Sequence, residues 1–257
     1  MRTAIWIGLG AVMVLGVAAG GAWAQSGHAL EFDGSDDRVL ISDPVNLTGP
    51  LTLEAWIRGD AFNGGRILSD RDAANAYELD VDSSGMLRFI TNGSIVGMVN
   101  ISAHLGQWVH VAVTWAGSAE GDLVMYVDGE AELNGYYWGA IIDATANLVI
   151  GNTPNGSFPF DGAIDEVRIF DNVVGQEAIR VWMTRRIDAG HPDHAHLQGA
   201  WSFEDASGQV ATCAVPGRDG QLGSDAGADA ADPAWIDSGM VGTTRSTWGG
   251  VKAGYRP

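Results

Sequence analysis

Apolar and polar residues alternate with a period of two along most of the chain, in short segments separated by turn residues. Residues 51–58 show the pattern clearly, because polar side chains and Trp56 fall between the positions of one apolar row. That row consists of Leu51, Leu53, Ala55 and Ile57. Alternation of this kind is typical of strands with one buried face. It also predicts strands at residues 77–81, 86–91, 109–115, 122–127, 148–150 and 163–170.

Three further features define the fold class. Asp128-Gly129 separates two of the predicted strands, and such a pair favours a two-residue type I′ hairpin turn. Residues 109–115 are apolar on both faces, which indicates a central strand. A helical pattern is convincing only at about residues 176–187. Many short strands with one late helix predict an all-β protein, a two-sheet antiparallel sandwich, rather than an α/β fold.

The two ends of the chain differ from this pattern. An apolar run over residues 4–22 follows Arg2 and ends in Ala22-Trp23-Ala24, a small-x-small cleavage pattern. We therefore predict a signal peptide at residues 1–24, export to the extracellular space or periplasm, and no membrane span after cleavage. The alternative is an uncleaved membrane anchor. Residues 25–238 form the predicted domain, and the polar, glycine-containing residues 239–257 a flexible tail.

Charge and cysteine content narrow the function classes. The formal net charge is −18, and Lys252 is the only lysine. This acidity excludes nucleic acid and anionic membrane surfaces as partners, since both need a basic footprint. It is compatible with carboxylates gathered for a cation. Cys213 is the only cysteine, so we expect a buried thiol, with pairing to another molecule as the alternative.

Five segments follow one another in an order found in a known family. They are residues 29–39 (ALEFDGSDDRV), 51–57 (LTLEAWI), 108–115 (WVHVAVTW), 125–130 (MYVDGE) and 160–170 (FDGAIDEVRIF). Together they resemble the laminin-G-like domains of the concanavalin A-like superfamily, which are common in exported bacterial proteins. The resemblance covers about residues 28–238 and implies a jelly-roll sandwich. It implies no single function, because the family includes sugar binders, adhesion modules and domains with no known ligand.

The related glucanases carry their catalytic acids on one strand as Glu-x-Asp-x-x-Glu. Here Glu78 and Asp80 match the first two acids, but Ser83 stands at the third. Alternation places Glu78, Asp80 and Asp82 on one face, which we expect to be solvated. We therefore predict no enzymatic activity, with a glycan hydrolase as the alternative.

Four aspartates are candidate ligands for Ca²⁺. Asp33, Asp36 and Asp37 crowd one turn, and closely spaced carboxylate oxygens suit this ion. Asp165 is expected to share an apolar row with Ala163, Val167 and Ile169, where a carboxylate must be paired, hydrogen-bonded or metal-bound. The resemblance also implies Ca²⁺ at a sandwich rim. We predict one structural Ca²⁺ involving these four aspartates; the alternative is turn capping and hydrogen bonding.

Tyr136, Tyr137 and Trp138 are candidate ligand-binding residues. Three adjacent aromatics in a strand cannot all face one core, and exposed aromatic faces stack on sugar rings. The alternative is packing against the second sheet.

We predict a secreted, non-catalytic binding or adhesion module whose partner is an extracellular glycan or a surface protein. A purely structural surface protein is a further alternative, and the oligomeric state stays open.

Overall fold

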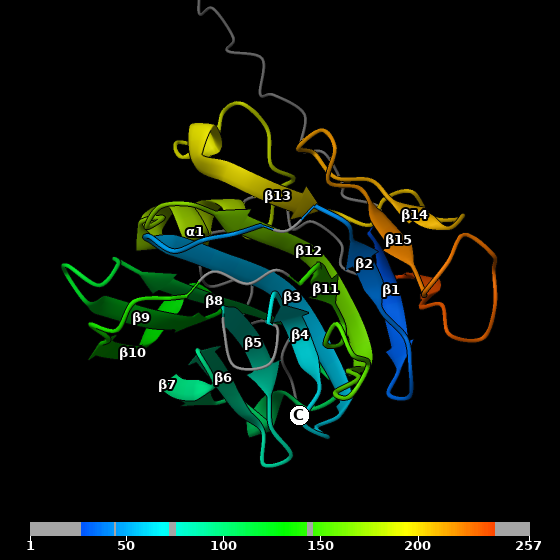
Figure 1. Cartoon of the computed structure of the whole chain (residues 1–257), viewed down its shortest axis with the longest axis horizontal. Coiled ribbons are helices and arrows are strands. Elements are labelled where there is room, and N and C mark those ends of the chain that lie inside the picture. The colour runs from blue at the N-terminus through cyan, green and yellow to red at the C-terminus, as the bar shows by residue number, and fades with distance from the viewer. Residues whose placement is uncertain (1–26, 44, 72–75, 143–145, 240–257) are drawn as a thin grey trace, which may run out of the picture.

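The computed structural model describes residues 27–239, apart from residues 44, 72–75 and 143–145. The predicted signal peptide and residues 240–257 of the predicted tail lie outside the described residues. The described chain forms two antiparallel sheets of eight strands each, which pack as the two layers of a sandwich (Figure 1). The predicted all-β architecture is therefore confirmed.

The first sheet has the strand order β10-β9-β8-β3-β12-β1-β16, and β13 pairs with β12 outside this path. Its strands are β1 (His28–Asp33), β3 (Leu51–Ala61), β8 (Val109–Trp115), β9 (Asp122–Val127), β10 (Glu130–Tyr136), β12 (Asp161–Phe170), β13 (Leu197–Trp201) and β16 (Ala234–Asp237). Segments from both ends of the described chain meet in this sheet, because β1 lies between β12 and β16.

The second sheet has the order β14-β15-β2-β11-β4-β5-β6-β7. Its strands are β2 (Val39–Ile41), β4 (Arg66–Ser69), β5 (Tyr77–Val81), β6 (Met86–Thr91), β7 (Ser94–Asn100), β11 (Leu148–Ile150), β14 (Val210–Ala211) and β15 (Gly220–Leu222). Two short 3₁₀ helices, Ser102–His104 and His194–His196, occur in the connections.

The main core lies between the two sheets. The apolar row predicted in β3 points into it and is buried, and Trp115 and Trp201 are among its largest fully buried side chains. Burying each such side chain stabilises the fold by about 1.5–3 kcal/mol. The Cys213 thiol is buried as predicted.

The β9–β10 hairpin forms at the predicted turn. Asp128 and Gly129 have φ angles of 49° and 76°, the positive values that a type I′ turn requires. The Asp128 carboxylate accepts a hydrogen bond from the His110 backbone N–H at 3.0 Å, which ties the turn to the neighbouring strand β8. β8 is buried along its whole length, so the predicted central strand is confirmed.

The helix α1 (Gln176–Trp182) covers the outer face of the first sheet and is shorter than predicted. Ile179 packs there in a second apolar cluster with residues of β8, β9 and β12. The predicted continuation to residue 187 is not observed, and side-chain donors bind the carbonyl groups at and beyond the end of the helix. Arg168 donates to the carbonyls of Trp182 and Arg185, and the Trp56 indole donates to that of Met183.

Candidate functional site

The three consecutive aromatic residues at the end of β10 point to opposite sides of the sheet. Tyr137 faces inward: its ring centroid lies 5.8 Å from that of Trp115, and its carbonyl accepts a hydrogen bond from the Trp115 indole at 2.8 Å. Tyr136 and Trp138 face outward and are 64% and 63% exposed. Their rings stack on each other, with 5.3 Å between centroids and 6° between planes. Two of the three predicted residues therefore form an exposed aromatic pair.

The position of this pair follows from the edge strand that carries it. Side chains alternate along β10, so exposed Asn134 lies on the same face as Tyr136. Across the strand pair, Tyr136 is opposite exposed Asp122. A Cβ on Gly121 would lie 2.6 Å from the Trp138 indole nitrogen, so only glycine leaves room for the ring. The result is an aromatic surface flanked by one carboxylate and one amide.

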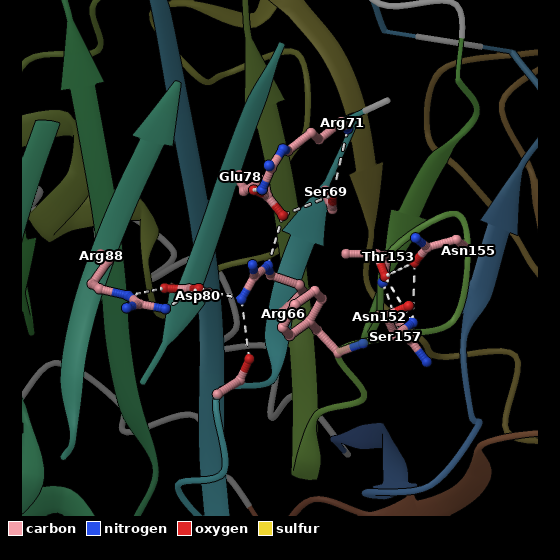
Figure 2. A network of polar contacts seen from close by, with 12 residues as sticks. Arg66, Ser69, Arg71, Glu78, Asp80, Arg88, Asn152, Thr153, Asn155 and Ser157 are labelled. Carbon is pink, nitrogen blue, oxygen red and sulfur yellow. Dashed lines mark hydrogen bonds and ion pairs between the residues drawn. The ribbon is translucent and has the colours of Figure 1, made fainter. Parts of the chain in front are cut away.

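The expected solvated face of β5 is instead a buried ionic network (Figure 2). Arg66 lies between the two carboxylates, donating from Nε to Glu78 Oε2 at 2.6 Å and from Nη1 to Asp80 Oδ2. Arg71 donates to Glu78 Oε1 at 2.6 Å, and Arg88 donates to both oxygens of Asp80 at 2.8 and 2.7 Å. The prediction that Glu78 and Asp80 are solvated is therefore wrong.

The physical reason is that strands β4 and β6 place arginines opposite these acids. Arg66 pairs in register with Asp80 across β4–β5, and Arg88 pairs with Asp80 across β5–β6. The ring of Phe158, from the loop after β11, lies 4.2 Å from the Arg66 guanidinium and shields it. Ser83 lies beyond the end of β5, in the turn to β6, so the strand offers no position for a third acid. The sequence analysis missed this network. Arg66 and Arg88, on the strands before and after β5, could have indicated partners for its acids.

The turn between β1 and β2 brings the predicted aspartates together. Asp33, Asp36 and Asp37 each offer an oxygen, and these oxygens lie within 4.8 Å of one another. Asp37 Oδ2 accepts a hydrogen bond from the Asp33 backbone N–H at 2.8 Å, whereas Asp37 Oδ1 is buried and has no hydrogen-bond partner. Burial is the main cause that raises the pKa of Asp37 to about 6, and repulsion from Asp33 and Asp36 adds to it. The hydrogen bond from the Asp33 backbone N–H acts in the opposite direction and lowers this pKa. This oxygen cluster has the chemistry of a hard-cation site.

Asp165 does not join that cluster, and its predicted place in the apolar row is wrong. A β-bulge at Asp165 and Glu166 shifts the register of β12 against β3, and Glu166 has a φ of 48°. The bulge leaves Asp165 opposite Trp56, whereas Val167 and Ile169 point into the main core. Asp161 pairs with Asp33, and Asp165 lies four residues further along the strand, roughly 13 Å away.

Asp165 is nevertheless buried. Its Oδ1 accepts the Glu166 backbone N–H at 2.7 Å, and its Oδ2 has no hydrogen-bond partner. Burial, then repulsion from Glu166, raises the pKa of this carboxyl to about 9, so it is a neutral acid at neutral pH.

A hollow of about 340 Å³, which the sequence did not indicate, lies beside the bulge. Its lining includes Glu166, Arg186, Glu204, Asp205 and Cys213. The Glu204 carboxylate lies 3.7 Å from the Arg186 guanidinium and 3.6 Å from the His28 imidazole. Of the charged residues that line the hollow, Arg186 and Glu204 thus lie close enough to form an ion pair with each other.

None of the described helices combines the length and the apolar character needed to cross a bilayer. The two packed antiparallel sheets, their crossover connections and the helix α1 on the outer face define a lectin-like jelly-roll sandwich. The chain belongs to the laminin G family of the concanavalin A-like lectin/glucanase superfamily, whose family model matches residues 33–180. The resemblance inferred from the five sequence segments is therefore confirmed.

Solved structures are similar to this chain at low sequence identity. One is a candidate carbohydrate-binding protein from Bacteroides ovatus, 18% identical, with a TM-score of 0.66 over 84% of this chain and 61% of that one. The chain thus spans less than two thirds of that protein. Another is a heptameric SAP-like pentraxin from Limulus polyphemus, 19% identical, with a TM-score of 0.48 over 62% of this chain and 82% of that one. A comparison with curated protein sequences found no match.

Proposed function

We propose that this protein is an exported, non-catalytic module that binds carbohydrate on the surface formed by Tyr136 and Trp138. The observation that carries the proposal is the exposed, parallel stack of these two rings. Large aromatic rings left in water cost hydrophobic free energy unless a ligand covers them, and exposed apolar patches commonly mark interaction sites. Tyr137 is left out of the proposed site because it packs against Trp115.

The chemistry around the stack suits a sugar. The apolar C–H face of a pyranose or furanose ring packs on an aromatic face, while its hydroxyl groups need hydrogen-bond partners at the edge. Asp122 accepts hydrogen bonds, and Asn134 both donates and accepts them. Both lie beside Tyr136 on the exposed face of the hairpin. The description of the Bacteroides ovatus protein as a candidate carbohydrate binder agrees with this assignment.

The absence of catalysis is proposed from the state of the acids on β5. A glycosidase needs one carboxyl group that holds a proton and one that is free to attack or to activate water. Glu78 and Asp80 are instead buried between three arginines, and Ser83 replaces the third acid. Export is proposed from the N-terminal apolar run and its cleavage pattern.

The test is binding of the full chain, purified after expression, to immobilised oligosaccharides and to soluble laminarin, xylan and arabinan by affinity electrophoresis. We expect retardation in at least one polysaccharide gel. Trp138→Ala and Tyr136→Ala should weaken it at least tenfold and leave the melting temperature nearly unchanged, because both rings are exposed. Tyr136→Phe keeps the ring and should retain most of the affinity.

Leu105→Ala is the matched control, because Leu105 is an exposed apolar side chain outside β9 and β10. It should bind like the unaltered chain. The proposal fails if no glycan on the array or in the gels is bound, or if binding survives both alanine substitutions at the stack.

A further inference from the structure

We propose that the aromatic surface of Tyr136 and Trp138 selects glycans whose sugars carry a protonated amino group, and that it discriminates against anionic glycans. This selectivity rests on the proposed function, because it concerns the sugar that the same two rings bind. The charges around the rings, and the lack of an internal cation over them in the described part of the chain, carry the assignment.

The charged residues of the β9–β10 hairpin are all acidic. No lysine, arginine or histidine occurs between His110 and Arg168 in the sequence. Exposed carboxylates occur at Glu120, Asp122 and Glu132, and none of them forms an ion pair with a described residue. The hairpin therefore attracts a cationic ligand and repels an anionic one over about 10 Å, the Debye length at about 0.1 M salt.

One arginine from another element reaches the hairpin, but it does so at the far end from the aromatic surface. Arg180 of α1 donates to the Gly129 carbonyl at 3.2 Å and to the Glu130 carboxylate. Glu130 and Tyr136 are the first and last residues of β10. The charge of Arg180 is therefore paired at the turn, and it leaves the negative charge of Asp122, opposite Tyr136, unbalanced.

The two rings also differ from other aromatic side chains of the domain. Elsewhere an arginine guanidinium lies 4.2–5.6 Å from the centre of an aromatic ring, namely Arg58 at Trp108, Arg66 at Phe158 and Arg185 at Trp182. No described arginine lies in this way over Tyr136 or Trp138. The faces of aromatic rings attract cations, most strongly in tryptophan. The exposed area of this ring pair therefore favours a cation that the ligand supplies.

The position of Asp122 fits the shape of an amino sugar. Asp122 is the cross-strand partner of Tyr136, and the Cβ atoms of such partners are about 4.5–5.5 Å apart. The nitrogen of an amino sugar is bonded to a ring carbon, so it lies at the edge of a sugar whose C–H face packs on Tyr136. A protonated amino group at this edge donates a charge-assisted hydrogen bond to the Asp122 carboxylate. A neutral sugar keeps the stacking but lacks the charged contacts.

The experiment is calorimetric titration of the purified chain with oligomers of glucosamine, N-acetylglucosamine and glucose, which have equal length and the same cellulose-like backbone. A mildly acidic pH keeps the amino groups protonated. We expect the glucosamine oligomer to bind at least about tenfold more tightly than the glucose oligomer, and the N-acetylated oligomer to bind like the glucose oligomer. The preference should largely disappear in about 1 M NaCl, where the Debye length is about 3 Å. Asp122→Asn should reduce it at least about threefold and leave the affinity for the glucose oligomer unchanged.

Asp188→Asn is the matched control, because it removes the same charge at an exposed position outside the hairpin. It should keep the full preference, whereas Trp138→Ala should weaken the binding of every oligomer. If Asp122→Asn does not fold, the salt dependence of the unaltered chain decides.

Equal affinities for the glucosamine and glucose oligomers, or an undiminished preference in Asp122→Asn, would overturn the selectivity and leave the proposed function standing. Undiminished glucosamine binding in Trp138→Ala would overturn it as well, since the acidic surface in general would then hold this oligomer. Binding of laminarin, xylan or arabinan without binding of the glucosamine oligomer would contradict the selectivity alone. Failure to bind any glycan would remove the proposed function together with it.

Discussion

Arg66 of β4 donates a hydrogen bond from Nε to Oε2 of Glu78 of β5 at 2.6 Å inside the protein. Both oxygens of the buried Glu78 carboxylate accept hydrogen bonds from arginines, Oε2 from Arg66 and Oε1 from Arg71, so the side chain is turned toward internal partners and not toward a substrate. The pair therefore bears on both the stability and the chemistry of the domain.

The first prediction is that the purified chain releases no reducing sugar from laminarin, xylan, agar or carrageenan. Glu78 and Asp80 are both occupied by arginines, and the strand ends before Ser83. The measurement is a reducing-end assay over prolonged incubation. Turnover that disappears in Glu78→Gln would contradict the prediction and restore a catalytic role to β5.

The second prediction concerns the stability contributed by the network. Glu78→Ala removes the buried carboxylate that Arg66 and Arg71 share, although Arg66 keeps its contact with Asp80, and breaking a buried ion pair from one side costs about 3–5 kcal/mol. Urea denaturation should show a loss of free energy of unfolding in this range. Glu132→Gln, at an exposed position of β10, should change it by about 0.5 kcal/mol or less. A loss below about 1 kcal/mol for Glu78→Ala would show that the network contributes little.

The third prediction is a pH dependence that arises from Asp165. In the folded state its pKa is about 9, whereas in the unfolded chain it is near 4, so the folded state binds the extra proton between these values. The contribution of protonated Asp165 to the free energy of unfolding is fully present below about pH 4. It is lost as the pH rises toward 9, because the unfolded chain then gives up this proton more readily than the folded protein does. Glu166 and Glu204 add to the upward shift, Arg168 opposes it, and Trp56 faces the group from β3.

Asp165→Asn removes this titration and keeps an oxygen that accepts the Glu166 N–H. The melting temperature of the variant minus that of the unaltered chain should therefore increase steadily from pH 5 to pH 9. Asp188→Asn, at an exposed site, should show a nearly constant difference. A constant difference for Asp165→Asn as well would mean that Asp165 is ionised in the folded protein.

The fourth prediction separates the inward and outward aromatic residues. Tyr137→Ala removes a ring that packs against Trp115 and should lower the free energy of unfolding by about 1.5–3 kcal/mol. Tyr136→Ala removes an exposed ring and should lower it by less than about 1 kcal/mol. Chemical denaturation of both variants provides the comparison. Equal losses would show that Tyr136 also supports the fold.

Local patterns allowed much of this architecture to be predicted. The period-two row of β3, the Asp128-Gly129 turn and the apolar faces of β8 depend on neighbouring residues and strand geometry, and all three occur as expected. The outward position of part of the aromatic run follows from the same alternation, because adjacent side chains of a strand point to opposite faces. The closeness of Asp33, Asp36 and Asp37 likewise follows from their positions within one turn.

Contacts between distant segments decided the rest. Alternation placed Glu78 and Asp80 on one face, but only the pairing of β5 with β4 and β6 set arginines opposite them and buried the charges. The bulge at Asp165 depends on how β12 pairs with β3, and one extra residue reversed the side to which every later side chain points. The carbonyls at the end of the helix are bound by Arg168 and Trp56, which no pattern within residues 176–187 indicates. The alternation of residues within a segment determines which side chains share a face of a strand. The pairing of that strand with distant segments determines whether this face contacts the core, a charged partner or solvent.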